Sequence, residues 1–258
     1  MDDFLALSGD LVDQNKRSQV LRLEIGSPRR CFYLKRHTHY VTRSWRHRFA
    51  AVPMIRQELE NLVDYARIGL DALEPAAWGW RFEGGRSRGF ILMEELTGYH
   101  SLNGLLSGNN GTRALVSRHL RPLGRAVAAT VSRVHRAGFA HRDLFSWHVF
   151  VRTAGENFDC QLIDLERSQT GRPLPGIRWW RRRKQAGDLA TLHLTVPFQQ
   201  VGPGRRMRFF LDYLGRDTLD DKAKAFLKIV FKEARRKSTK NKFRPYGVSD
   251  LLRRRPGA

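Results

Sequence analysis

The sequence predicts an α+β fold with two lobes, a small sheet-rich lobe followed by a mainly helical one. Alternating apolar and polar residues over 20–36 are typical of a hairpin of strands. The composition changes over residues 98–112, which are rich in glycine, asparagine and serine. Beyond them apolar residues recur every three or four positions, as in helices. We therefore expect a first lobe over residues 1–96, a helical lobe over 97–231, and a basic helix end with a tail over 232–258.

The predicted first lobe contains a small antiparallel sheet and one helix. Leu21 and Leu23 alternate with charged residues, and a Gly-Ser-Pro turn separates them from a second strand that ends at Lys35. A helix follows and should stop near Gly69. A short apolar run, Phe90–Met93, predicts a buried strand. The apolar face of the helix is expected to comprise Ile55, Leu59, Leu62, Val63 and Ala66.

The predicted second lobe begins with a long helix that carries apolar residues from Leu120 to Val134 and stops at Gly138. Two short strands follow, over His148–Val151 and Gln161–Ile163. The remainder of this lobe is expected to be helical over 185–196, 204–215 and 218–236.

Composition limits the class of protein. The chain has 258 residues, of which 41% are hydrophobic, so it can build a sizeable core. Two cysteines exclude a disulfide scaffold. The acidic start, Met1-Asp2-Asp3, does not fit a signal peptide, and no apolar window is long enough to span a membrane. We therefore expect a soluble, cytoplasmic protein. The formal net charge of +22 favours a polyanionic partner.

The motif that carries chemistry is His141-Arg142-Asp143-Leu144, which follows the predicted helix stop. Asp164 comes at the end of the next strand pair, so both carboxylates can face one cleft. Phosphoryl transfer needs one carboxylate for the attacking hydroxyl and another for Mg²⁺. A strand lysine paired with a helix glutamate would position the nucleotide phosphates, and Lys35 and Glu58 fit these roles.

This arrangement resembles protein kinases and, within that fold, the lipopolysaccharide kinase (Kdo/WaaP) family. The likeness covers roughly residues 18–200, and it implies an ATP- and Mg²⁺-dependent enzyme that phosphorylates heptose or Kdo in the inner core of lipopolysaccharide. Such an enzyme would act at the cytoplasmic face of the inner membrane. The segments that carry the resemblance are Tyr33-Leu34-Lys35, Glu58, Gly138–Asp143, His148, Ile163–Gln169 and Gly187–Ala190.

The resemblance implies a role for each matching residue. Asp143 would be the catalytic base, Asp164 a Mg²⁺ ligand, Lys35 the phosphate clamp and Glu58 its ion-pair partner. The lobe over 1–96 would bind the nucleotide, with the main chain of Glu94, Glu95 and Leu96 as the adenine hinge. Structural support of the catalytic loop would come from His141, Arg142 and Asp188.

Three departures from ordinary protein kinases affect these expectations. His148 stands where a second Mg²⁺ would have an asparagine, and imidazole is a poor replacement for an oxygen ligand. The segment after Asp164 carries Glu166 in place of glycine. No glycine-rich loop precedes the first strand, so cover for the phosphates would have to come from other main chain or from Lys16 and Arg17.

Three basic clusters, over residues 29–48, 178–184 and the tail, suggest an electropositive surface. Trp179 and Trp180 beside arginines suit an anionic membrane face, which the peripheral protein would contact, and nucleic acid is not expected to be the partner. The leading hypothesis is a kinase of an anionic glycolipid. The alternatives are a protein or small-molecule kinase of the same fold, and a pseudokinase that binds anionic membrane or nucleic acid.

Overall fold

The computed structural model describes residues 1–70, 73–83, 86–108, 113–155, 157–170, 178–240 and 243. The chain forms two compact units. Unit 1 comprises Met1–Thr97 together with Leu165–Arg167, and unit 2 comprises Gly98–Asp164 and Ser168–Ala258. An antiparallel sheet dominates unit 1 and helices dominate unit 2, so the predicted α+β class is confirmed.

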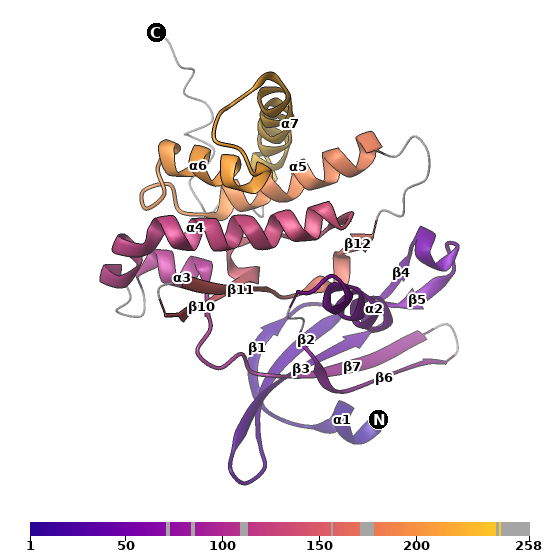
Figure 1. Ribbon diagram of the computed structural model, residues 1–258. Helices are drawn as coiled ribbons and strands as arrows, with labels where there is room; N and C mark the ends of the chain where they lie inside the picture. The colour runs from indigo at the N-terminus through magenta and orange to yellow at the C-terminus, as the bar shows by residue number, and fades with distance from the viewer. Residues whose placement is uncertain are drawn as a thin grey trace. The chain divides into compact units, whose positions relative to one another are not determined.

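Unit 1 is built on a five-stranded antiparallel sheet in the order β1-β2-β3-β7-β6 (Figure 1). The predicted hairpin is β2–β3, and the strand predicted at Phe90–Met93 is the middle of β7. One face of the sheet carries a small apolar core that includes Leu21, Leu34 and Phe90. The strands are β1 (Asp10–Gln14), β2 (Ser18–Ile25), β3 (Arg30–Thr38), β6 (Pro75–Glu83) and β7 (Arg86–Glu94).

The helix α2 (Met54–Arg67) contacts β6, β7 and the short 3-10 helix η3 (Leu165–Arg167). Unit 1 also contains elements that the sequence pattern did not indicate: α1 (Asp2–Ala6), β4 (Val41–Arg43), η1 (Trp45–His47) and β5 (Ala51–Pro53).

The predicted apolar face of α2 is partly wrong. Ile55 and Leu62 are buried, but Val63 is 51% exposed. Polar side chains take the buried places instead, among them Glu58 at 1% and Asn61 at 0% exposure. Periodicity records apolar residues alone, and these polar residues are buried because each has a partner, as shown below.

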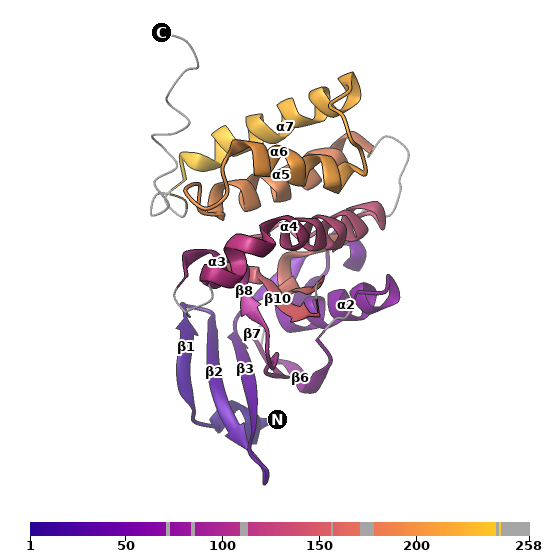
Figure 2. The ribbon, with the colours of Figure 1, turned by 60° about the vertical axis from the view of Figure 1, so that its left-hand side comes forward.

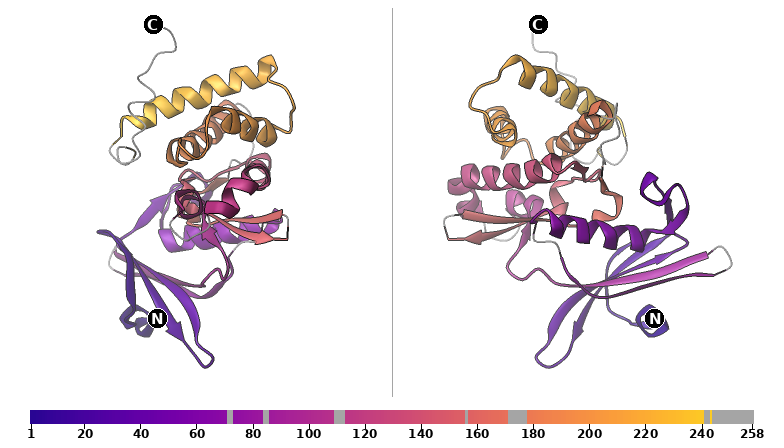
Figure 3. Two further views of the ribbon diagram at one scale, coloured as in Figure 1. Left: turned by 90° about the vertical axis from the view of Figure 1, so that its left-hand side faces the viewer. Right: turned by 45° about the vertical axis from the view of Figure 1, so that its right-hand side comes forward.

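Unit 2 combines a helical layer with short strands. Helix α7 lies along α5 (Figures 2 and 3), and α4 packs on α6. The predicted strand pair is the hairpin β10–β11, and His148 belongs to η2 just before it. The helices are α3 (Leu102–Ser107), α4 (Arg113–Arg136), α5 (Arg178–Thr195), α6 (Pro203–Leu214) and α7 (Asp221–Ser238). The other elements are β8 (His100–Ser101), β9 (Phe139–Ala140), η2 (Ser146–His148), β10 (Val149–Ala154), β11 (Asn157–Leu162) and β12 (Gln169–Thr170).

Two further predictions concern the chain as a whole. Helix α7 extends to Ser238, and most of the predicted basic tail, residues 241–242 and 244–258, lies outside the described residues. Among the residues that the structure describes, no helix is both long and apolar enough to cross a membrane.

Candidate active site

Lys35 lies on β3 in unit 1 and pairs with Glu58 of α2. The Lys35 Nζ lies 3.0 Å from Glu58 Oε2 and 3.3 Å from Oε1. Both side chains are buried, at 10% and 2% exposure, so the two charges meet in a low-dielectric environment. Lys35 and Glu58, which the sequence analysis paired, form an ion pair in the structure.

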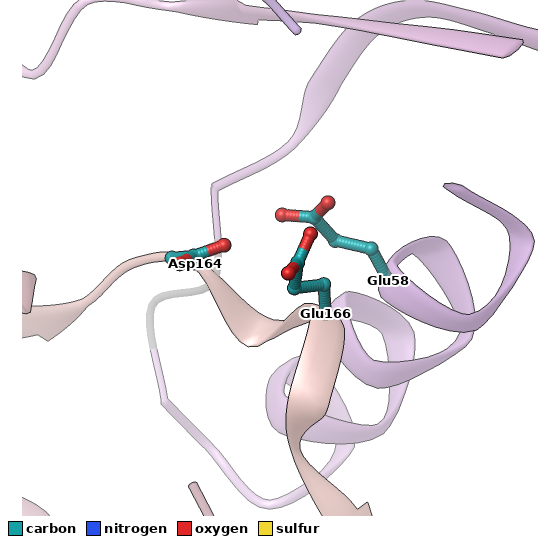
Figure 4. A group of neighbouring side chains, drawn as sticks. All are labelled: Glu58, Asp164 and Glu166. Atoms are coloured by element: carbon teal, nitrogen blue, oxygen red, sulfur yellow. The ribbon is translucent and has the colours of Figure 1, made fainter. Parts of the chain in front are cut away.

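A second carboxylate contacts the same lysine. Glu166 of η3 places Oε2 3.1 Å from Lys35 Nζ and 3.5 Å from His37 Nε2. The hydroxyl of Tyr40 donates to Glu166 Oε1 at 3.2 Å. Figure 4 shows the Glu58 and Glu166 carboxylates pointing toward each other. The sequence analysis noted Glu166 only as a departure from glycine. Its position, two residues after the predicted metal ligand Asp164, was the signal that could have identified it as a site residue.

Polar contacts fix η3 in unit 1. The Asn61 side-chain amide donates to the Leu165 carbonyl at 2.6 Å, and the Gln57 amide donates to Asn61 Oδ1 at 3.1 Å. These bonds explain why α2 buries polar residues, and they hold Glu166 next to Lys35.

The predicted hinge, Glu94 to Leu96, follows directly on β7. The Glu95 amide donates to the Cys31 carbonyl at 2.9 Å, which continues the pairing with β3. Arg30 binds the Glu94 carboxylate. Arg22 binds Glu95, and this hydrogen bond is the main reason why the pKa of Glu95 is below its usual value. Arginines of the sheet thus bind the carboxylates of both Glu94 and Glu95.

A tight turn joins β1 to β2 where a glycine-rich loop would stand. Asn15 Oδ1 accepts hydrogen bonds from the main-chain amides of Arg17 and Ser18, at 2.9 and 3.0 Å. The Thr38 amide donates to the Arg17 carbonyl at 2.9 Å, which ties the turn to β3. Lys16 and Arg17 are exposed on this turn.

In unit 2, Asp188 of α5 holds the catalytic-loop motif by its main chain. Its carboxylate accepts from the amides of His141, at 2.7 Å, and Arg142, at 2.8 Å, and from His135 Nε2 at 3.2 Å. Burial raises the pKa of Asp188, but the hydrogen bond from His135, together with charge interactions that include Lys237, outweighs burial and holds this pKa below its usual value. Arg142 adopts a left-handed φ of 70°, a strained conformation for a side chain with a Cβ.

Three of the predicted site residues lie close together after this loop. His148 Nδ1 contacts the Asp143 carbonyl at 2.9 Å, and its Nε2 lies 3.7 Å from Asp164 Oδ2. Because a carbonyl only accepts, Nδ1 carries a proton, and Nε2 is the ring nitrogen that faces the carboxylate. The His141 ring donates from Nε2 to the Ile163 carbonyl at 3.0 Å, and burial lowers the pKa of His141. Asp164 has a left-handed φ of 59°.

The sequence-predicted residues thus fall into two groups. Unit 1 contains Lys35 and Glu58 in direct contact, with the hinge residues at the end of β7. Unit 2 contains the catalytic-loop motif with Asp188 beneath it, and Asp164 close to His148. Unit 1 by itself offers a buried lysine for phosphate, and unit 2 by itself offers carboxylates for a hydroxyl and a cation, which are the parts of phosphoryl transfer.

Comparison with known proteins agrees with this arrangement. Over 176 residues the chain is 31% identical to the lipopolysaccharide core heptose(I) kinase WaaP of Pseudomonas aeruginosa, covering 65% of this chain and 62% of that protein. A 3-deoxy-D-manno-octulosonic acid kinase of Xylella fastidiosa is 33% identical over 124 residues, 48% of this chain and 44% of that protein. The matched part is therefore less than two thirds of the length of either relative.

A solved structure, WaaP in complex with acyl carrier protein, superposes with a TM-score of 0.66 and 26% identity over 91% of each chain. Residues 2–206, most of the chain, match one protein family. The chain belongs to the lipopolysaccharide kinase (Kdo/WaaP) family.

Proposed function

We propose that the chain is an ATP- and Mg²⁺-dependent kinase that phosphorylates a core sugar, heptose or Kdo, of a lipopolysaccharide-like glycolipid. The observation that carries the proposal is the catalytic loop, in which Asp188 holds the amides of His141 and Arg142 immediately before Asp143. The names of the relatives, a heptose kinase and a Kdo kinase, support the substrate class.

The chain's own residues would act mainly by position and charge. Asp143 would accept the proton of the sugar hydroxyl as that oxygen attacks the γ-phosphorus of ATP and ADP leaves. Lys35, steadied by Glu58, would hold the α- and β-phosphates. The main chain of Glu94–Leu96 would contact the base, and Lys16 and Arg17 of the β1–β2 turn would cover the phosphates.

The donors around Asp164 suit a cation. His148 Nε2 and the Asp164 carboxylate oxygen lie 3.7 Å apart, so a cation between them would meet one nitrogen and one oxygen donor. Asp164 would be the main ligand, because Mg²⁺ prefers oxygen, and His148 would orient it or complete the site. When bound, Mg²⁺ would neutralise charge on the phosphates.

The test is transfer of labelled γ-phosphate from ATP to purified glycolipids, one ending in Kdo and one carrying heptose. We expect label in one of them, dependent on Mg²⁺ and lost in Asp143→Ala while ATP still binds. Asp159→Ala is the matched control, since this exposed carboxylate of β11 pairs with Arg152. Transfer at near wild-type rate by Asp143→Ala would refute the assigned base.

The same assay separates the alternatives. Label in a protein or in a small molecule, but in neither glycolipid, would reassign the substrate within the fold. ATP binding without transfer to any acceptor would favour a pseudokinase, and the basic surfaces would then become the functional site.

We also propose that the protein works at the surface of the inner membrane. Trp179 of α5 is 67% exposed, and the guanidinium of Arg183 lies 5.6 Å from its ring centre. Aromatic and cationic side chains together suit an anionic bilayer interface. Sedimentation with phosphatidylglycerol vesicles should weaken as salt rises, because salt screens exposed charges. Binding that ignores salt would contradict this attraction.

A carrier protein is a further proposed partner, because the superposed structure is of WaaP in complex with acyl carrier protein. Unit 2 has an open pocket of about 620 Å³ between α5, α6 and α7, with arginines among mainly apolar residues. Such a pocket suits an apolar chain carried by an acidic protein. Calorimetric titration with acylated and unacylated carrier protein tests this, with Ile229→Glu, inside the pocket, expected to abolish the difference between them.

A further inference from the structure

A half-buried lysine of unit 2 lies among positive charges. Lys184 of α5 points its ammonium at the Trp180 ring, 5.0 Å from the ring centre. Burial lowers the pKa of Lys184, and the nearby guanidiniums of Arg142, Arg183 and Arg236 lower it further. Within the part of the chain that the structure describes, no carboxylate forms an ion pair with this ammonium.

Two described acids of α5 and α7 in this region are already engaged. Asp188 accepts from the catalytic-loop amides and from His135. Glu233 of α7, which is 3% exposed, binds Arg183 through one oxygen and Arg236 through the other, both at 2.8 Å. Lys237 adds a fifth cation, and its Nζ donates to the Gly187 carbonyl at 2.7 Å. Among the described residues of α5 and α7 near Lys184, cations therefore predominate.

The cluster borders the catalytic loop. Lys184 lies four residues before Asp188 on α5, so the two side chains share one face of the helix. Asp188 binds the amide of Arg142, and Asp143 is the next residue. These cations of α5 and α7 therefore adjoin the loop that carries Asp143, the residue proposed to receive the acceptor's hydroxyl.

We propose that Lys184, with Arg142 and Arg236, binds an anionic group, a phosphate or a carboxylate, on the sugar acceptor. This inference rests on the proposed function and refines its substrate: the acceptor carries a negative charge near the hydroxyl that is phosphorylated. A partly buried lysine among guanidiniums is unfavourable until an anion joins them. Guanidinium and ammonium groups together are also the usual donors to phosphate and carboxylate. One relative's substrate is named as an acid, which has such a group.

The first experiment measures anion binding without catalysis. The thermal midpoint of the full chain is followed in inorganic phosphate and in chloride at equal ionic strength. We expect phosphate to raise it in the wild type and in Lys228→Gln, an exposed α7 lysine with the same charge change, and the rise to be smaller in Lys184→Gln. Equal responses of the three proteins would overturn the site.

The second experiment measures transfer to the glycolipid acceptor. Lys184→Gln should raise the KM for the acceptor by about tenfold, the loss typical of one charged hydrogen bond, with the KM for ATP within about twofold. Lys184→Arg should restore most of the affinity, and Lys228→Gln should behave as wild type. An unchanged acceptor KM in Lys184→Gln, with transfer intact, refutes the inference and leaves the proposed function standing.

One control distinguishes an anion on the sugar acceptor from a lipid headgroup. A second outcome distinguishes failure of this inference from failure of the proposed function. Lys184→Gln should bind phosphatidylglycerol vesicles as wild type does; a loss there with an unchanged acceptor KM would assign the site to a lipid headgroup and overturn our assignment. In that second outcome, neither the wild type nor the variants transfer phosphate to glycolipid, while phosphate still raises the thermal midpoint of all but Lys184→Gln. In that case Lys184 binds an anion, but the acceptor assignment fails together with the proposed function.

Discussion

The candidate site residues of unit 1 and those of unit 2 are held in different ways. In unit 1, Lys35 is held by charge, with carboxylates of Glu58 and Glu166 at 3.0 and 3.1 Å. In unit 2, the catalytic loop is held by its main chain, through hydrogen bonds from His141 and Arg142 to Asp188. The residues of unit 1 are thus held by ion pairs between side chains, and the loop of unit 2 by main-chain hydrogen bonds to a buried carboxylate.

This difference has a physical consequence. A main-chain hydrogen bond fixes the path of the loop whatever its side chains are, so the identities of the loop residues remain available for chemistry. A charged side chain held by other charges can exchange partners, and a phosphate can take part of the contact that Glu166 makes with Lys35. Unit 2 should therefore tolerate change at its anchor less well than unit 1 does.

The largest expected effect is at the anchor of unit 2. Asp188→Ala leaves two buried amides and His135 without their acceptor, and we expect a loss of about 5 kcal/mol in the free energy of unfolding. Asp188→Asn, which keeps one oxygen, should lose about half as much. Urea unfolding at pH 7 measures both, with Asp159→Ala as the surface control. A loss below about 1 kcal/mol in Asp188→Ala would mean that the loop has another anchor.

The next effect tests the charge-held half. Lys35→Met leaves Glu58 and Glu166 as two buried carboxylates next to each other, and should cost about 3–4 kcal/mol of folding free energy. Adding Glu166→Gln removes one of these charges and should recover a part of that loss. A double-mutant cycle by urea unfolding gives the coupling between the two sites. Strictly additive effects would show that Glu166 does not share Lys35 with Glu58.

The sequence predicted the two halves unequally. Lys35, Glu58 and Asp143 follow from motif spacing, because each is tied to a local turn, strand or helix, and the role of Asp188 follows from the family resemblance. Glu166 and the buried polar face of α2 were missed. The Tyr40 contact to Glu166 spans 126 positions and the Asn61 contact to Leu165 spans 104. Periodicity can show which apolar residues are buried, but not which polar residue will meet a distant partner.

A smaller effect concerns the acid sensitivity of unit 2. Burial, helped by Arg206, lowers the pKa of His193 from 6.5 to about 4. Between these values the unfolded chain binds a proton that the folded chain does not, so folding free energy is lost as the pH falls from about 6.5 toward 4. The shift corresponds to about 3 kcal/mol. His193→Asn, which keeps an acceptor for Arg206, should unfold with a shallower pH dependence in this window. Identical slopes for the two proteins would contradict this assignment.

The smallest effect separates positioning from bulk stability in unit 1. Tyr40→Phe removes the hydroxyl that donates to Glu166 and should cost about 1 kcal/mol of unfolding free energy. Ser132→Ala is the matched control, since the buried Ser132 hydroxyl of α4 donates to the Tyr213 carbonyl at 2.8 Å in unit 2. If Glu166 positions Lys35, Tyr40→Phe should also raise the KM for ATP by a few-fold, and Ser132→Ala, with a similar loss of stability, should not. Equal KM values for ATP in the two variants would show that Glu166 only connects η3 to the sheet. Glu58 alone would then position Lys35.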